Sequence, residues 1–426
     1  MEVVPCKRRP YSTLEKIEMK KTLVALAAIA SVSAFAQSSV TLTGLVDMGY
    51  GRIDYKGNAV TFSSLPNGSA TTNFTFLVNE DLGGGLKADA RWEIDPDLTQ
   101  TVGKTSGTSS TGTTSNVTSS LGNGYSFLGL SGGFGALKFG TINYATISAN
   151  GDGNLGFGTA IGSGYRVSSF DAVRAQNAMR YDTPDMNGFS ASYLLSEKND
   201  LQANVLTTGM TGNLVNQTQG RDKVSEFALL YAQGPVTARY AALTTEQWGK
   251  TATTYTTLGS AYNISGWTSG TGAQFKLNTL SVKYDVNSAI SVGYFNQIAK
   301  SDSLIVANAA ATGSSTTAYD RKTNGIAVTY ANGPVKYMFN YQTVTNGDGA
   351  VKAAATSSAS TTSLSGLSAK VLGLGVDYSM SKRTTVYGRC EKDTDSSASF
   401  RSITGYTAAT NNTTYTATAI GIRHTF

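Results

Sequence analysis

The chain contains one motif with the spacing of a catalytic site. Gly129-Leu130-Ser131-Gly132-Gly133 matches the nucleophile elbow, in which a serine at a strand-to-helix turn is activated by a histidine and an acid. The sequence has a single histidine, His424, near its end. Gly132 and Gly133 are also followed by Phe134-Gly135, a run that favours a β-hairpin turn. We therefore predict no catalytic residue and expect no enzymatic activity.

Cofactor and metal sites are not expected either. The glycine-rich run 151–158 lacks the Lys-Ser/Thr ending of a phosphate-binding loop and the repeats of a calcium β-roll. One histidine offers no metal ligand set. Cys390 shares its strand parity with Val386 and Gly388, so we expect it on the apolar face and inert. The sequence thus predicts no cofactor-binding and no metal-binding residues.

The remaining chemistry is that of fixed charges on strand faces. Arg91 lies opposite in parity to Trp92, and Arg180 lies opposite to its apolar neighbours. Because Arg174 and Arg180 are six residues apart, we expect them on one face of one strand. Asp47 and Glu93 have the polar parity of neighbouring segments, and Asp152 and Asp171 lie in the long segment 143–173. Fixed charges on the wall of a pore affect which ions pass through it, and they do not catalyse a reaction.

We expect these charged residues to lie on β-strands, because apolar and polar side chains alternate along the body of the sequence. In residues 335–342 one face is continuously aromatic and the other carries Lys336, Asn340 and Gln342. The last segment, 414–426, places Ile420, Ile422, His424 and Phe426 on one face. A final strand that ends on an apolar-face aromatic residue resembles the C-terminal signature of bacterial outer-membrane β-barrels. For His424 we expect a structural role at the lipid interface or in a subunit contact.

Connection lengths alternate along the chain. Seven short turns alternate with eight long polar loops, which indicates about sixteen strands with both termini on one side. About sixteen strands enclose a lumen too wide for side chains to fill, so the apolar face should point outward. Tyrosines that precede short turns predict an aromatic girdle: Tyr181, Tyr231, Tyr284, Tyr330 and Tyr378.

Composition agrees with this architecture without deciding it. Charged residues make up 15% of the sequence, against about 25% in ordinary domains. No apolar run in the body is long enough for a spanning helix. The same composition fits a secreted β-solenoid or sandwich.

The start of the chain predicts export. Residues 19–36 combine two lysines, an apolar run and a small-x-small cleavage site, as a signal peptide does. We expect residues 1–18 to be a non-native extension or an extended n-region, and residues 37–426 to be the mature barrel. The net charge of +6 falls to about +3 in the mature chain, so no nucleic-acid partner is expected.

Six segments resemble the trimeric general porins of Gram-negative bacteria, particularly those of β-proteobacteria. They run from the first mature strand to the last: residues 40–44 (VTLTG), 80–88 (EDLGGGLKA), 129–135 (GLSGGFG), 177–184 (NAMRYDTP) with 188–189, 377–384 (DYSMSKRT) and 421–426 (GIRHTF).

The resemblance implies an all-β fold, a sixteen-stranded antiparallel transmembrane β-barrel with an inward-folded third extracellular loop at residues 143–173. It implies a homotrimer in the outer membrane, passive diffusion of small hydrophilic solutes and ions, contact with membrane lipid and lipopolysaccharide, and insertion by the barrel-assembly machinery. Ile422, His424 and Phe426 would form the insertion signature.

The basic ladder of that family is thinned in this chain. Asn73, Gly124 and Thr141 stand where the resemblance leads us to expect arginine. The resemblance then leaves three wall bases, Arg91, Arg174 and Arg180. It implies that Asp152 and Asp171 are the acids of the third loop, and that Asp47 and Glu93 are lumen acids on neighbouring strands. We expect weak ion selectivity with a tilt toward anions. The alternatives are a substrate-selective channel of the same fold, for example for organic acids, and a surface barrel that acts as an adhesin or receptor.

Overall fold

The computed structural model describes residues 38–55, 58–96, 98, 124–158, 160–164, 174–197, 221–248, 274–307, 314–347, 351–353, 361–363, 366, 368–395 and 413–426. The predicted extension and signal peptide, residues 1–36, lie outside the described residues.

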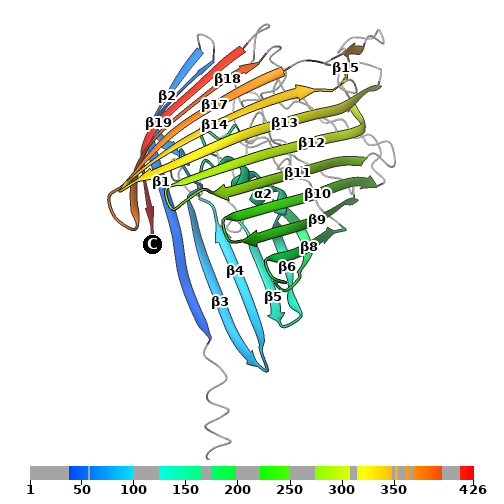
Figure 1. The fold of residues 1–426 in the computed structure, drawn as a ribbon. Coiled ribbons are helices and arrows are strands. Elements are labelled where there is room, and N and C mark those ends of the chain that lie inside the picture. Colours follow the sequence, from blue (N-terminus) through cyan, green and yellow to red (C-terminus); the bar gives the residue numbers. More distant parts are fainter. Residues whose placement is uncertain are drawn as a thin grey trace, which may run out of the picture.

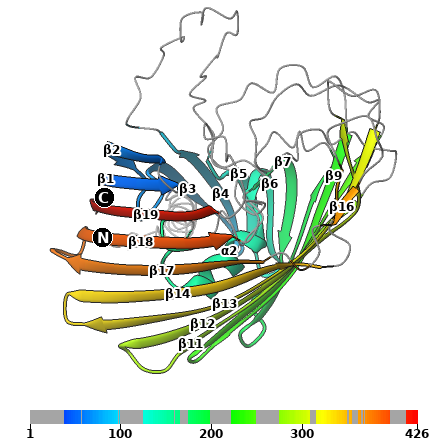
Figure 2. The same ribbon diagram turned by 90° about the horizontal axis from the view of Figure 1, so that it is seen from above.

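A single antiparallel sheet closes on itself to form the wall of the molecule (Figures 1 and 2). β1 and β19 close the ring, from Leu45 opposite Thr425 to Tyr55 opposite Tyr415. β2 and β3 pair with the same edge of β1, so they share one position, and the barrel has sixteen strands as predicted. The strands of the wall are β1 (Ser39–Tyr55), β2 (Asn58–Pro66), β3 (Asn73–Gly83), β4 (Leu86–Ile94), β5 (Ser126–Gly132), β6 (Gly135–Asn143), β7 (Arg174–Asp182), β8 (Phe189–Ser196), β9 (Arg221–Gln233), β10 (Val236–Trp248), β11 (Gln274–Asp285), β12 (Ile290–Ala307), β13 (Ser314–Asn332), β14 (Val335–Asn346), β17 (Ser368–Ser379), β18 (Thr384–Asp395) and β19 (Thr413–Thr425).

The seven predicted short turns join strand pairs at one end of the barrel. Three segments expected to be long loops contain β-structure. Residues 57–70 include β2, residues 302–320 extend β12 and β13 into a ribbon, and residues 347–368 contain β15 (Val351–Ala353) paired with β16 (Thr361–Ser363). Polarity suggested loops for residues 302–320 and 347–368, but strands that extend beyond the wall have no apolar face to bury and can be polar on both sides.

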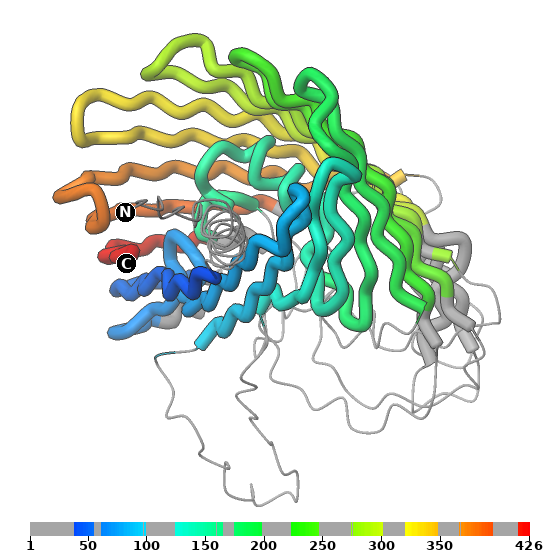
Figure 3. Tube along the Cα trace, turned by 90° about the horizontal axis from the view of Figure 1, so that it is seen from below, coloured from blue at the N-terminus to red at the C-terminus, as the bar shows by residue number. Residues whose placement is uncertain are grey.

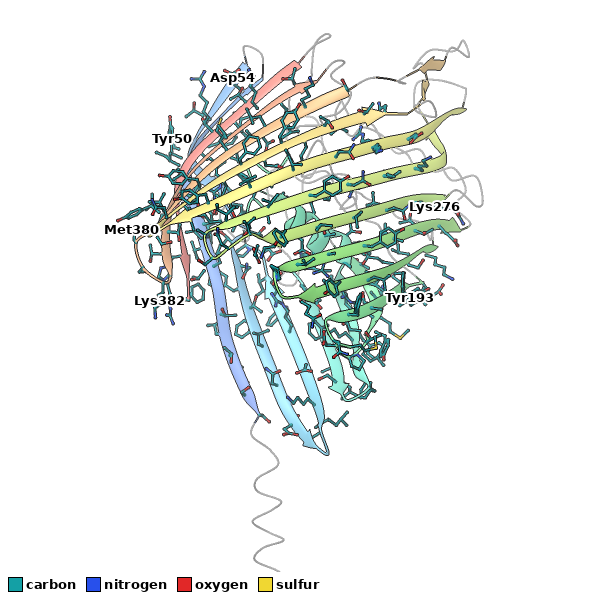
Figure 4. The ribbon with its side chains drawn as sticks, in the orientation of Figure 1. Tyr50, Asp54, Tyr193, Lys276, Met380 and Lys382 are labelled. Atoms are coloured by element: carbon teal, nitrogen blue, oxygen red, sulfur yellow. The ribbon has the colours of Figure 1, made fainter. Side chains whose placement is uncertain are left out.

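Side chains alternate between an apolar outer face and a polar inner face. On β14, Tyr337 and Phe339 are exposed, whereas Asn340 and Gln342 are buried on the inside. Figure 4 labels Tyr50 and Met380 among the outer side chains, and both are more than half exposed. Of the five tyrosines in the predicted girdle, Tyr231 is partly buried and the other four are exposed: Tyr181, Tyr284, Tyr330 and Tyr378. The outer wall therefore suits contact with hydrocarbon.

A helix, α2 (Ala145–Asn154), lies inside the ring of strands, as the view from below in Figure 3 shows. It contacts β10, β11, β12 and β13. Leu155, with φ 48°, ends it in the left-handed conformation. Within the described part of the chain, no helix is long and apolar enough to cross a membrane.

The residues just before this helix belong to an apolar cluster on the inner side of the wall. Ile142 at the end of β6 and Tyr144 are buried there with Leu194, Leu243 and Leu277, which come from β8, β10 and β11. Full burial of each large apolar side chain contributes about 1.5–3 kcal/mol. Packed apolar side chains thus line this part of the inner wall.

Candidate functional site

The inner segment, residues 144–164, is held to the wall at three points, of which the first is the helix N-terminus. Glu226 on β9 accepts hydrogen bonds from the backbone N–H of Ala145 (2.5 Å) and Thr146 (2.9 Å) and from the Thr146 hydroxyl (2.7 Å). Its carboxylate is buried and faces the positive end of the helix dipole. Glu226 therefore serves as the N-terminal cap of α2 from a distant strand, since Tyr144 supplies no side-chain cap.

The second point is an ion pair in the last turn of the helix. Arg239 on β10 donates to Asp152 at 2.9 Å, and both side chains are partly exposed to the lumen. The backbone of α2 also lies close to the backbone of β12 at this end of the helix, because a Cβ on Gly293 of β12 would collide with the Gly153 carbonyl. Glycine at this position lets the helix lie directly on the wall.

The third point holds residues 160–164. Glu391 on β18 accepts hydrogen bonds from the N–H groups of Gly162 (2.7 Å) and Gly164 (3.2 Å). The side-chain amides of Asn340 and Gln342 donate to carbonyls of the same turn at 2.7–2.9 Å. The wall thus satisfies both the donors and the acceptors of a buried loop.

A basic cluster lies beside this turn. Arg389 contacts Asp377 at 2.7 Å, and Arg423 contacts the same carboxylate at 3.5 Å. Lys336 is the register partner of Asp377, and no described residue forms an ion pair or hydrogen bond with its ammonium group. Arg389 also lies over the Phe157 ring at 5.9 Å from the centroid. Three cations therefore surround one carboxylate.

The three predicted wall bases lie near the lumen, but each is paired. Arg91 contacts Glu93, Arg174 contacts Asp95 at 3.3 Å, and Arg180 contacts Asp182 at 2.7 Å. Burial raises the pKa of Asp95, which follows β4, although Arg174 opposes that shift. These bases form local ion pairs rather than one ladder.

A bulge in β7 lies between Arg174 and Arg180, so their spacing of six residues does not by itself place them on one face. Gly140 pairs with Ala178, whereas Ile142 pairs with Ala175, so β7 carries one extra residue at a bulge. Asn177 takes up this extra residue with φ 48°. One inserted residue inverts the alternation of a strand, so an even spacing across it no longer places two side chains on one face.

The predicted acids have different environments. Glu93 pairs with Arg91 and accepts from the Tyr125 N–H at 3.1 Å. Asp47 is fully buried and accepts hydrogen bonds from two backbone N–H groups and a tyrosine hydroxyl, so it does not present a free charge to the lumen. Asp152 lies on the inner helix as described above. Asp171 lies outside the described residues.

Sequence reasoning missed the anchors and the basic cluster. Glu226, Arg239, Arg389 and Arg423 all have inward parity in strands whose other face is apolar, so parity could have found them. Their partners could not be found that way, because each contact joins segments distant in sequence.

The predicted C-terminal residues close the wall. Phe426 exchanges two backbone hydrogen bonds with Gly44, each 3.1 Å long, and its ring lies 5.6 Å from that of Phe74. Ile422 is exposed on the outer face, and His424 forms a 2.9 Å hydrogen bond with the Thr384 hydroxyl. These residues thus join β19 to the start of the barrel, and their recognition as an insertion signature stays a prediction.

Comparison with known proteins agrees with this geometry. A family model described as Gram-negative porin matches residues 22–398. The chain is 32% identical to the major outer membrane protein P.IB of Neisseria lactamica, over 44% of this chain and 52% of that protein. It is 34% identical to the outer membrane porin protein 32 of Delftia acidovorans, over 41% of this chain and 49% of that protein. The chain thus spans about half the length of the curated relatives it matches.

Among solved structures, the anion-selective porin from Comamonas acidovorans shares the fold, with a TM-score of 0.63 at 19% identity over 92% of this chain and 100% of that one. A closed barrel with an apolar outer wall and outer-membrane relatives indicates an outer-membrane protein, and a channel rather than an enzyme. The match over residues 22–398 shows that the chain belongs to the Gram-negative porin family.

Proposed function

We propose that this protein is a water-filled channel through which small hydrophilic solutes and ions diffuse passively across the outer membrane. The observation that carries the proposal is the inner segment, anchored at three points across a polar lumen. Its contacts with Glu226, Arg239 and Glu391 hold a helix and a turn against the inner wall. In this position the segment narrows the passage but does not fill it with apolar side chains.

The channel has a weak preference for anions. Three inward acids, Asp47, Glu226 and Glu391, are buried and accept hydrogen bonds from backbone N–H groups. Lys336 and Arg423 remain partly exposed beside the single carboxylate of Asp377. The charge that meets a permeating ion is therefore more positive than a count of inward residues suggests.

Planar-bilayer recording of the purified protein in a salt gradient tests both statements. We expect conductance steps and a reversal potential on the anion side of zero. The double variant Lys336→Gln, Arg423→Gln should shift the reversal potential toward cations, and Lys276→Gln, at the distant end of β11 (labelled in Figure 4), serves as the control. Absence of steps would refute the channel. Current blocked by one organic acid at low concentration would indicate a substrate-selective channel instead.

We also expect the assembly that the porin resemblance implies. The protein forms a homotrimer, contacts membrane lipid and lipopolysaccharide, and is inserted by the barrel-assembly machinery. The exposed apolar side chains around the wall, among them Val40, Leu128 and Ile420, provide surface for both lipid and neighbouring subunits. Chemical cross-linking in native membranes should give a trimer. Detection of the monomer alone after cross-linking would contradict the trimer.

Residues 19–36 direct export and are removed. Mass spectrometry of the protein from outer membranes should therefore find an N-terminus at Gln37. An N-terminal peptide that begins before residue 37 would contradict the cleavage site.

A further inference from the structure

The connection between β2 and β3, residues 67–72, leaves the wall and projects into the lumen; we name it the inward bulge. β1 pairs with Pro66 at Met48 and with Asn73 at Leu45. Between these two pairs β1 advances by three residues, whereas the chain from β2 to β3 advances by seven. The extra residues must therefore leave the plane of the sheet. Ser69 is buried within it.

A carboxylate at the base holds the inward bulge. Asp47 of β1 accepts hydrogen bonds from the N–H groups of Ser69 (2.8 Å) and Ala70 (2.6 Å). Its other oxygen accepts from the Tyr387 hydroxyl at 2.5 Å. Arg423 of β19 adds a 2.8 Å hydrogen bond to the Ser69 hydroxyl. The bulge is therefore held by groups from three wall strands, in addition to its internal hydrogen bond from the Thr72 N–H to the Asn67 side chain (2.7 Å).

Tyr387 reaches Asp47 by lying across two strands. It starts on β18, and Gly421 on β19 and Gly49 on β1 lie beneath its hydroxyl. A Cβ on Gly421 would collide with the tyrosine ring, and one on Gly68 would lie 2.6 Å from its hydroxyl oxygen. Glycine at these positions makes a slot that admits an aromatic side chain flat against the inner wall.

The inner segment lies beside the base of the inward bulge. Leu65 of β2, two residues before the bulge, packs with Tyr387 and Ala419, and Ile161 of the inner segment packs against this cluster. Two inward-facing residues of β18 hold the two elements. Tyr387 holds the bulge through Asp47, and Glu391 holds the turn at residues 160–164. One strand thus positions both projections into the lumen.

From these contacts we infer that the inward bulge is a second wall of the constriction, and that Tyr387 is a positioning residue that sets its place. The inference rests on the proposed channel function. It assigns Asp47 a positioning role in place of the role of a lumen charge, and it makes the width of the passage depend on residues 67–72 as well as on residues 144–164.

Cysteine modification tests the position of the bulge. Thr71, an exposed residue of the bulge, becomes the probe as Thr71→Cys in a Cys390→Ser background. A bulky methanethiosulfonate reagent should cause a stepwise loss of single-channel current. Wild type, which retains Cys390, is the control and should keep its current. Complete modification by mass spectrometry with unchanged current would overturn the inference.

Removal of one hydroxyl tests the role of Tyr387. Tyr387→Phe keeps the ring and the net charge but loses the bond to Asp47, so the bulge should move. We expect an altered conductance and noisier open-channel current with an unchanged reversal potential. Tyr378→Phe, on the exposed outer face, is the matched control. Wild-type conductance and noise in Tyr387→Phe would refute the positioning role. Absence of steps in wild type would instead refute the channel itself.

Discussion

Truncation of Glu226 should release the inner helix while leaving the barrel intact. The side chain is 2% exposed and accepts three hydrogen bonds from residues 145 and 146. A hydrogen bond to a charged group contributes about 1.5 kcal/mol at the low end, and a favourable helix-terminus charge up to about 2 kcal/mol. These terms share one carboxylate and overlap, so for Glu226→Ala we expect the helix to lose about 3–5 kcal/mol of docking free energy.

Hydrogen exchange followed by mass spectrometry measures this loss directly. Since about 1.4 kcal/mol corresponds to a tenfold change, amides in peptides that cover residues 144–158 should exchange roughly 10²- to 10⁴-fold faster. Glu226→Gln retains one acceptor oxygen and should show a smaller increase. Amides of β9 and β10 should stay protected, because their ladder is untouched.

A matched control is available on the neighbouring strand. Glu246 of β10 accepts a hydrogen bond from Gln274 at 2.9 Å and has the opposite strand parity to the inward-facing Thr245. Glu246→Ala should leave exchange in residues 144–158 unchanged. If Glu226→Ala leaves it unchanged as well, or if all strands lose protection together, the reasoning about this anchor is refuted.

Three further outcomes follow from single contacts. Asp152→Asn leaves the Arg239 guanidinium without its carboxylate, so the reversal potential should move toward anions; a shift toward cations would contradict the pairing. Burial raises the pKa of Asp95, so this carboxyl takes up a proton at higher pH than an ordinary aspartate and then ceases to neutralise Arg174. Anion preference should therefore rise on acidification in wild type and rise less in Asp95→Asn; equal pH profiles would exclude this group. Phe426→Ala removes the ring contact with Phe74 beside the junction of β19 and β1, so the yield of heat-modifiable, folded protein should fall, and an unchanged yield would contradict its role.

Local rules in the sequence were enough for the architecture. Apolar alternation over residues 335–342 and 414–426 predicted strands with one apolar face, and both segments lie in wall strands as expected. Short Gly-, Asn- and Pro-containing turns predicted the strand count. These features depend on neighbours two to four residues apart, which is the range over which a sequence can be read directly.

Local rules failed where one residue changes the register or where an extra strand forms in a segment expected to be a loop. The bulge at Asn177 interrupts the alternation between Arg174 and Arg180, so the spacing of these two residues no longer gives their faces. Residues 58–66 were expected in a loop, but they pair with β1 as β2. Neither feature has a reliable local signal, because a bulge or an added pairing is chosen by the partner strand.

The sequence by itself therefore determined that this chain forms a barrel with an apolar exterior, a polar interior and a porin's succession of turns. Closure of the barrel determined which inward charges meet. It brought Tyr387 against Asp47, Glu391 against Gly162, and Glu226 against the start of a helix, pairs separated by 81 to 340 positions. Alternation assigns each side chain to a face, but a carboxylate is free or neutralised according to what the opposite wall places within hydrogen-bonding distance.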